Sequence, residues 1–130
     1  MTATLTAVRA ELERRRDRMV AELRTLVEHQ SPTGDVRRLD ALADVLSDRW
    51  RGLGATVIRH EVPGTGTHLE LHWPGPAGTP AAAAPVLLLG HYDTVHDAGG
   101  LERNPWRVDA QGRAWGPGAQ DMKSGLVIIH

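Results

Sequence analysis

The segment VLLLGHYDTV, residues 86–95, decides the fold of this chain of 130 residues. Its first four residues are a short aliphatic run that ends at Gly90, a pattern typical of a buried β-strand. In open α/β sheets, ligands bind just beyond the carboxyl ends of such strands. We therefore expect an α/β fold in which His91 and Asp93 lie at the mouth of a site.

His91 and Asp93 are two positions apart, so on extended backbone their side chains lie on the same face. The Asp93 carboxylate could then orient the His91 ring or share a ligand with it, and a metal-binding histidine commonly has such an acceptor. The alternative is that His91 is a turn histidine whose hydrogen bonds are satisfied within the protein.

A second polar motif, GPGAQDMKSG at residues 116–125, precedes the apolar run 126–129. We interpret this run as part of a helix that begins near Met122. Asp121 lies at the junction and can reach toward the same site as His91. Alternatively, Asp121 caps the helix that follows it, which is a common role for Asp before an apolar run.

Four short motifs occur in an order and at a spacing that are found in one group of enzymes: GHYDTV at 90–95, NPW at 104–106, GPG at 116–118 and DMKSG at 121–125. The chain resembles the zinc exopeptidase family of acetylornithine deacetylase, succinyl-diaminopimelate desuccinylase, aminoacylase and glutamate carboxypeptidase. The GPG motif is most similar to the glutamate carboxypeptidase branch. Residues 31–34, SPTG, also match, so the resemblance spans nearly the whole chain.

The resemblance implies that His91 is a ligand of one zinc ion, that Asp93 is the catalytic-site residue that holds its imidazole, and that Asp121 bridges two zinc ions. It further implies hydrolysis of an amide bond in a small peptidyl or N-acyl amino acid, with the two ions activating water and polarising the carbonyl. Nitrogen and oxygen ligands also suit cobalt or manganese. The implied fold is the amino-terminal part of a mixed-sheet, three-layer catalytic domain.

Several parts of such a site are missing from the sequence. In the family, a glutamate pair beyond the bridging aspartate supplies the general base and a ligand, but no glutamate follows Asp121 here. A catalytic zinc site normally has three protein ligands. We therefore interpret residues 1–130 as a truncated, partial catalytic domain without a lid or dimerisation domain, inactive by itself, and either a truncated gene product or a fragment of a longer chain. The alternative is a degenerate, non-catalytic fragment that binds a partner protein.

Composition excludes other classes of function. The chain has 15 Lys and Arg against 16 Asp and Glu, so nothing in its charge favours a nucleic-acid or membrane partner. It has no cysteine, which excludes disulfides and thiolate zinc ligands. The first residues do not resemble a signal peptide, and no window approaches the roughly 20 apolar residues of a membrane span. These features predict a cytoplasmic protein.

Periodicity predicts most of the remaining elements. Apolar residues recur at helical spacing over residues 5–28 and 36–50, and the first helix is expected to pack along its length. Residues 55–62 and 67–73 alternate in polarity and predict a β-hairpin. Residues 74–85 read as a loop of low complexity.

A second, small hairpin is predicted within residues 106–115, after an irregular stretch. His68 and His72 alternate with apolar residues and should share one face of the first hairpin, where they are either solvated or able to bind metal. His96 lies near the expected site but belongs to no motif.

The predicted strand 86–90 has no expected neighbour in the sequence. A parallel neighbour requires a crossover of a dozen or more residues, and the chain ends within the helix that would form it. Unpaired strand edges tend to pair with other chains. We therefore expect a complementing chain or a homo-oligomer.

Overall fold

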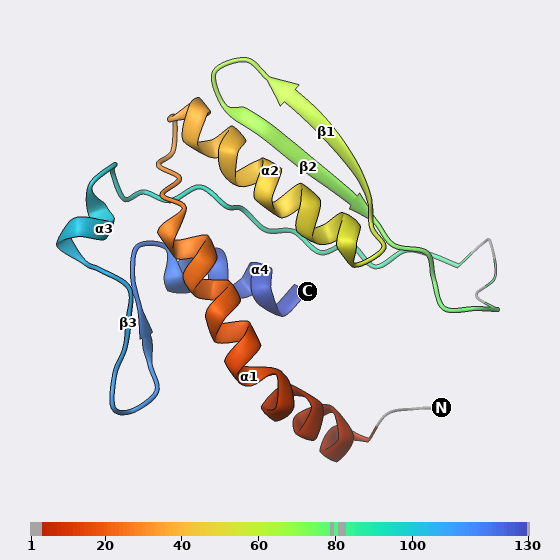
Figure 1. Cartoon of the computed structure of the whole chain (residues 1–130). Coiled ribbons are helices and arrows are strands. Elements are labelled where there is room, and N and C mark those ends of the chain that lie inside the picture. Colours follow the sequence, from red (N-terminus) through yellow and green to blue (C-terminus); the bar gives the residue numbers. More distant parts are fainter. Residues whose placement is uncertain (1–3, 79, 81–82, 130) are drawn as a thin grey trace.

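The computed structural model describes residues 4–78, 80 and 83–129. In chain order, its elements are α1 (Leu5–Glu28), α2 (Val36–Gly52), β1 (Thr56–Val62), β2 (Gly66–His72), α3 (Gly100–Arg103), β3 (Arg107–Val108), β4 (Ala114–Trp115), the distorted helical turn η1 (Ala119–Lys123) and α4 (Ser124–Ile129). β1 pairs with β2 and β3 with β4, both antiparallel. This mixture of helices and small sheets confirms the predicted α/β class (Figure 1).

The two long helices begin where the sequence supplies a cap. The Thr4 hydroxyl accepts a hydrogen bond from the Ala7 N–H, and the Asp35 carboxylate accepts one from the Arg38 N–H at 3.1 Å. Such side-chain acceptors satisfy N–H groups that have no partner within the first turn. Both predicted helices are therefore confirmed.

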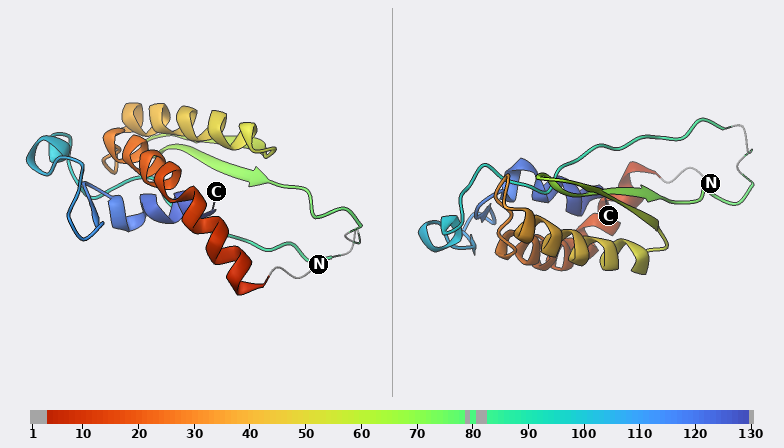
Figure 2. Two further views of the ribbon diagram at one scale, coloured as in Figure 1. Left: turned by 60° about the horizontal axis from the view of Figure 1, so that its bottom comes forward. Right: turned by 90° about the horizontal axis from the view of Figure 1, so that it is seen from above.

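The core lies where the end of α1, the length of α2 and the short α4 meet. Val27 and Leu42 are fully buried, and Leu46, Leu126 and Val127 are each at most 6% exposed. α1 and α2 lie on the same side of the β1–β2 hairpin (Figure 2). Burial of these aliphatic side chains is the main stabilising contribution, of about 1.5–3 kcal/mol for each one fully buried.

The first half of α1 does not join this core. Leu5, Val8 and Leu12 are 89%, 44% and 50% exposed, and this end of the helix extends away from the rest of the molecule (Figure 1). The prediction that the whole helix packs was therefore wrong for its first turns. Helical periodicity identifies an apolar face, but a face is buried only where another element reaches it.

The β1–β2 hairpin follows the predicted alternation. Leu69 and Leu71 pack against the core, while His68 and His72 point to the exposed side. Asp40 of α2 accepts hydrogen bonds from the N–H and hydroxyl of Thr67, at 2.9 and 2.8 Å, which fixes β2 against the helix.

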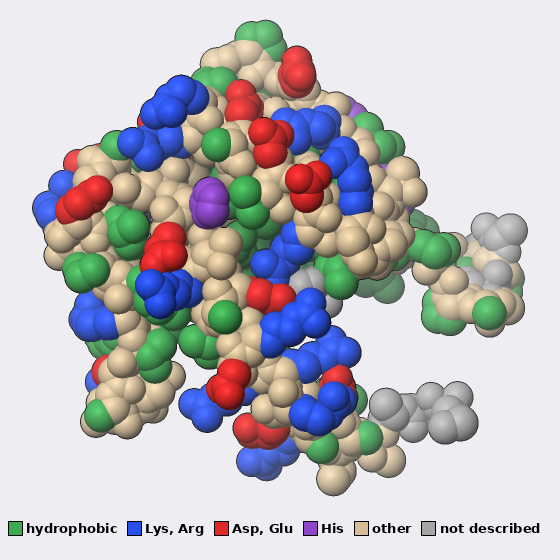
Figure 3. Space-filling model, viewed as in Figure 1, with side chains coloured by type: hydrophobic (Ala, Val, Ile, Leu, Met, Phe, Trp, Pro, Cys, Tyr) green, Lys and Arg blue, Asp and Glu red, His purple; other side chains and the backbone are tan. Residues whose placement is uncertain are grey.

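The surface shows no large area of a single charge on the face seen in Figure 3, where basic and acidic side chains are interspersed over the helices. Within α1, pairs such as Arg24–Glu28, with 2.8 Å between Nε and Oε1, account for this mixture. Among the described residues, no helix is both long and apolar enough to cross a membrane.

The predicted buried strand at residues 86–90 is the main difference between the sequence-based expectation and the structure. No strand forms there, and Val86, Leu87, Leu88 and Leu89 are 86%, 77%, 61% and 81% exposed. A strand requires hydrogen bonds to a neighbour, and none of the described segments pairs with this one. The loop before it is the predicted 74–85 segment, of which residues 79, 81 and 82 lie outside the described part.

The β3–β4 hairpin is organised by one carboxylate. Asp109 accepts hydrogen bonds from the N–H groups of Gln111 and Arg113, from Arg113 Nε and from Trp115 Nε1, at 2.7–3.0 Å. The Trp115 hydrogen bond is the largest of the effects that lower the pKa of Asp109 to about 2. The guanidinium of Arg107 lies 4.7 Å from the centroid of the Trp115 ring, which adds a cation–π contact.

The polar segment 91–94 and the turn at 116–118 approach each other closely at Gly118. A Cβ atom on Gly118 would lie 2.4 Å from Thr94 Cγ2, and the residue has a φ of +70°. Glycine therefore serves two purposes here: it permits this backbone conformation and leaves room for Thr94.

Replacing Gly118 should separate these two effects. Gly64 has a φ of +83° with nothing within 4 Å of its Cβ position, so Gly64→Ala tests backbone strain alone. We expect Gly64→Ala to lower the free energy of unfolding by about 1 kcal/mol. Gly118→Ala should lower it by roughly 3 kcal/mol, because the clash with Thr94 adds to the strain. Urea denaturation followed by circular dichroism measures both, and equal losses would contradict the proposed contact.

The Asp109 interactions predict a pH dependence confined to the β3–β4 hairpin. Because the pKa of Asp109 is lower in the folded chain than its ordinary value of 3.8, its contribution is complete above that value and is lost as the pH falls through about 2. The Trp115 indole N–H signal in NMR should therefore keep its folded position down to about pH 3. Asp109→Asn, which removes the charge, should abolish the transition, whereas a transition that persists in this variant would assign it to another group.

Candidate functional site

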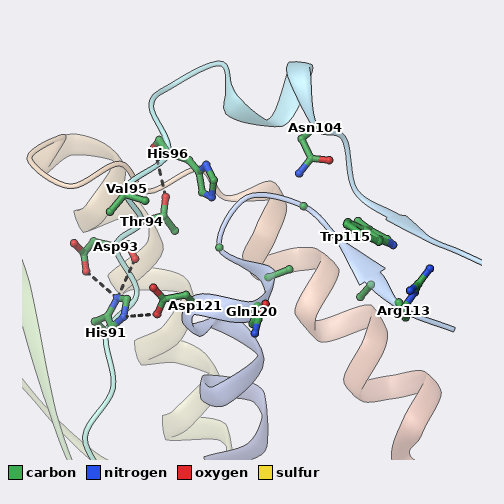
Figure 4. A pocket seen from close by; sticks show the side chains of 14 residues that line it. His91, Asp93, Thr94, Val95, His96, Asn104, Arg113, Trp115, Gln120 and Asp121 are labelled. Carbon is green, nitrogen blue, oxygen red and sulfur yellow. Dashed lines mark hydrogen bonds and ion pairs between the residues drawn. The ribbon is translucent and has the colours of Figure 1, made fainter. Parts of the chain in front are cut away.

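His91, Asp93 and Asp121, which we call the His91 cluster, lie in direct contact (Figure 4). His91 Nε2 is 3.1 Å from Asp121 Oδ1, although the two residues are thirty positions apart. On the other side of the ring, Nδ1 is 3.2 Å from Asp93 Oδ1 and 3.1 Å from the Asp93 carbonyl oxygen. The imidazole is thus held between two carboxylates.

The segment that carries His91 and Asp93 is fixed by a short parallel interaction with residues 31–33. The Thr94 N–H donates to the Ser31 carbonyl at 2.8 Å, and the Thr33 N–H donates to the Thr94 carbonyl at 2.9 Å. The Ser31 hydroxyl donates to the Tyr92 carbonyl at 2.6 Å. These backbone contacts set the position of the residues on either side of His91.

Asp121 reaches the cluster because the chain leaves helical geometry at this point. Its φ and ψ are −115° and 100°, and regular helix begins only at Ser124. In the described part of the chain, the Asp121 carboxylate contacts His91 and accepts no hydrogen bond from the backbone of α4. The alternative in which Asp121 is simply a helix cap does not describe this structure.

Two opposing effects act on the ionisation of His91. Burial of part of the ring disfavours its charged form, while hydrogen bonds from the ring to the Asp93 carbonyl and the Asp121 carboxylate, together with both negative charges, favour it. The net effect raises the pKa of His91 above its ordinary value of 6.5. Both ring nitrogens face acceptors, so the charged ring donates on both sides.

The His91 cluster forms one wall of an open pocket of about 520 Å³ (Figure 4). The opposite wall comes from Arg113 and Trp115 of the β3–β4 hairpin and from Asn104. His96 also lines the pocket. The pocket therefore combines an acidic, imidazole-bearing side with an aromatic and basic side, and is large enough for a small organic molecule.

The donor set of the cluster fits part of a metal site. His91 offers Nε2, Asp121 offers a carboxylate that is 83% exposed, and Asp93 orients the ring through Nδ1. Imidazole nitrogen and carboxylate oxygen are suitable ligands for zinc, cobalt or manganese. Among the described residues, however, no three His, Cys, Asp or Glu side chains are placed to hold one ion. The cluster can therefore supply two ligands of a larger set.

The other predicted histidines lie elsewhere. His68 and His72 are on the exposed face of the β1–β2 hairpin, where Glu70 accepts hydrogen bonds from His60 and His72 at 2.8 and 2.6 Å. These hydrogen bonds lower the pKa of Glu70. The described part of this face contains no group of three residues able to hold a metal.

Two residues that support the cluster were not identified from the sequence. The Thr33 hydroxyl donates to Asp93 Oδ2 at 2.6 Å, and the buried Lys123 amine donates to backbone carbonyls at the end of α1. Thr33 belongs to the SPTG motif at 31–34, one of the matches that support the family resemblance. This motif is the feature of the sequence from which Thr33 could have been identified.

Two comparisons with known proteins bear on this site. Residues 87–130, which include the whole His91 cluster, match peptidase family M20/M25/M40. The chain is also 33% identical over 115 residues to carboxypeptidase G2 from Pseudomonas sp. (strain RS-16), an alignment that covers 86% of this chain and 26% of that protein. The chain thus spans about a quarter of the length of this relative. Both matches confirm the resemblance that the motifs predict, and the segment that carries the two motifs belongs to peptidase family M20/M25/M40.

Proposed function

We propose that this chain contributes part of the active site of a metal-dependent hydrolase that cleaves an amide bond. The observation that carries the proposal is the position of the His91 ring, which contacts both Asp93 and Asp121 at the wall of an open pocket. The similarity to a carboxypeptidase and to a peptidase family supports the same reaction class.

In this proposal, His91 and Asp121 are metal ligands and Asp93 is a positioning residue. Asp93 accepts a hydrogen bond from Nδ1–H, which keeps the proton on Nδ1 and leaves the Nε2 lone pair available on the side of Asp121. Asp121 supplies negative charge next to that nitrogen. A divalent metal bound here, zinc in the first instance, would provide a Lewis acid that polarises an amide carbonyl and makes water more nucleophilic.

The similarity to a carboxypeptidase and the size of the pocket support one class of substrate. We propose a small peptidyl or N-acyl amino acid, as in a glutamate-carboxypeptidase-like enzyme. The pocket volume of about 520 Å³ suits a molecule of this size. The Trp115 ring on the opposite wall offers a surface for an apolar or aromatic acyl group.

The remaining ligands and the general base must come from outside the described residues, because these contain no complete metal group. We propose that they belong to the part of such an enzyme that residues 1–130 do not include, supplied either by a longer form of this chain or by a complementing polypeptide. The exposed aliphatic run 86–89 offers a segment for such pairing, since it presents apolar side chains and backbone groups without a strand partner among the described residues.

Metal binding can be tested on the chain itself. Titration with zinc chloride, followed by NMR of the histidine side chains, should shift the His91 ring signals first. His91→Ala and Asp121→Asn should each weaken zinc binding about tenfold or more, since each removes one of two ligands. His68→Ala is the matched control and should leave the affinity unchanged, because His68 lies on the β1–β2 hairpin. Equal zinc affinity in all four proteins would contradict the proposal and favour a non-catalytic, partner-binding role.

Catalysis requires a second experiment. The chain alone should show no hydrolysis of an acylated glutamate. Addition of zinc and a separately expressed polypeptide covering the remainder of a carboxypeptidase G2-like protein should produce hydrolysis that depends on His91 and Asp121. Absence of hydrolysis when both polypeptides are folded and bound to each other would overturn the proposed activity.

A further inference from the structure

The end of α1 and the residues after it, 26–33, contact both chain segments that form the His91 cluster. We call residues 26–33 the α1-end segment. At one end of it, the carbonyls of Leu26 and His29 each accept a hydrogen bond of 2.9 Å from Lys123 Nζ. At the other end, the Thr33 hydroxyl donates to Asp93 Oδ2 at 2.6 Å.

The contact at Thr33 determines how Asp93 faces His91. The two carboxylate oxygens have separate partners, with Oδ2 on the Thr33 hydroxyl and Oδ1 on His91 Nδ1. A charge-assisted hydrogen bond to one oxygen restricts rotation of the carboxylate and so directs the other oxygen. The Thr33 hydroxyl also lies 3.2 Å from the Thr94 carbonyl, which accepts a hydrogen bond of 2.9 Å from the Thr33 N–H. Replacing Thr33 by Val removes both hydroxyl contacts and leaves this backbone hydrogen bond in place.

The contact at Lys123 fixes the turn that carries Asp121. Lys123 is the single lysine of the sequence and is 1% exposed, two positions after Asp121. Its amine donates to carbonyls in and just after the last turn of α1, where such groups lack partners within the helix. Its backbone N–H also donates to the Gly118 carbonyl at 3.0 Å. The turn is therefore tied to α1 close to Asp121.

We propose that the α1-end segment sets the separation of His91 and Asp121, with Thr33 as the positioning residue on the His91 side and Lys123 on the Asp121 side. The proposal rests on the proposed function, because it assigns these residues to a divalent metal held by His91 and Asp121. Neither residue contacts the metal in this scheme. Each acts through the ligand or orienting residue that it holds.

The Thr33 arm is tested by removing the hydroxyl without changing the shape of the side chain. Thr33→Val should weaken zinc binding at His91 about tenfold, the lower end of what such indirect contacts contribute. It should also change the NMR signals of the His91 ring before any metal is added. Thr33→Ser restores the hydroxyl and should restore both. Thr25→Val is the control, because Thr25 is exposed on α1 and, within the described part of the chain, its hydroxyl donates to the Ala21 carbonyl of the same helix.

The role of Lys123 is tested with Lys123→Met, which keeps an unbranched apolar side chain but removes the amine. With the helical circular dichroism preserved, zinc affinity should again fall about tenfold, while the NMR signal of Asp93 stays in place. If this variant does not fold, the Thr33 variants decide the proposal, because Thr33 is exposed and its replacement leaves the core intact.

The outcomes separate the two proposals. Failure of zinc to perturb His91 in the wild-type chain would overturn the proposed function. Zinc binding that depends on His91 and Asp121 but is equal in wild type, Thr33→Val and folded Lys123→Met would overturn the role of the α1-end segment and leave the proposed function standing.

Discussion

The arrangement of the site depends on one close approach, between the polar segment at 91–94 and the glycine-containing turn at 116–118. The approach is possible because Gly118 has no side chain where Thr94 Cγ2 lies, 2.4 Å from the Cβ position. It is maintained because Ser31 is hydrogen-bonded to the Tyr92 carbonyl, and because Lys123 is hydrogen-bonded both to Gly118 and to Leu26 of α1. His91 and Asp121, thirty positions apart, are therefore held in contact by hydrogen bonds of their neighbours to residues 26–33, which precede both of them in the chain.

The elements that sequence patterns predicted correctly are those stabilised by contacts within the element or with its neighbour. Asp35 caps α2, and Leu69 and Leu71 alternate with exposed residues on β2, so local patterns suffice. The run at 86–89 differs because an aliphatic pattern indicates burial but does not supply the neighbouring strand that burial requires. Helix α1 shows the same difference between pattern and burial: Leu5 lies on its apolar face but is exposed, because no other element covers it.

The sequence predicted the residues that form the His91 cluster, but it did not predict the residues that hold the cluster in place. His91, Asp93 and Asp121 stand in short motifs whose residue types indicate the geometry that the structure shows, with the ring between two carboxylates. Lys123 also stands in one of these motifs, but its residue type does not indicate its role, because its partners are backbone carbonyls, which every residue has. The role of Thr33 was also not predicted, since a hydroxyl in a turn more often forms a hydrogen bond with a nearby residue than with one sixty positions away.

The β3–β4 hairpin differs from the rest of the pocket in how it is held together. Asp109 satisfies donors from Gln111, Arg113 and Trp115, all within six positions of itself. Short-range hydrogen bonds thus help this wall keep its shape, in addition to the packing of Trp106 and Ala114 against the core. Because these hydrogen bonds close within the hairpin, the residues between Val108 and Ala114 could be exchanged to change the lining of the pocket, while the imidazole and its two carboxylates, which lie on other segments, keep their contacts.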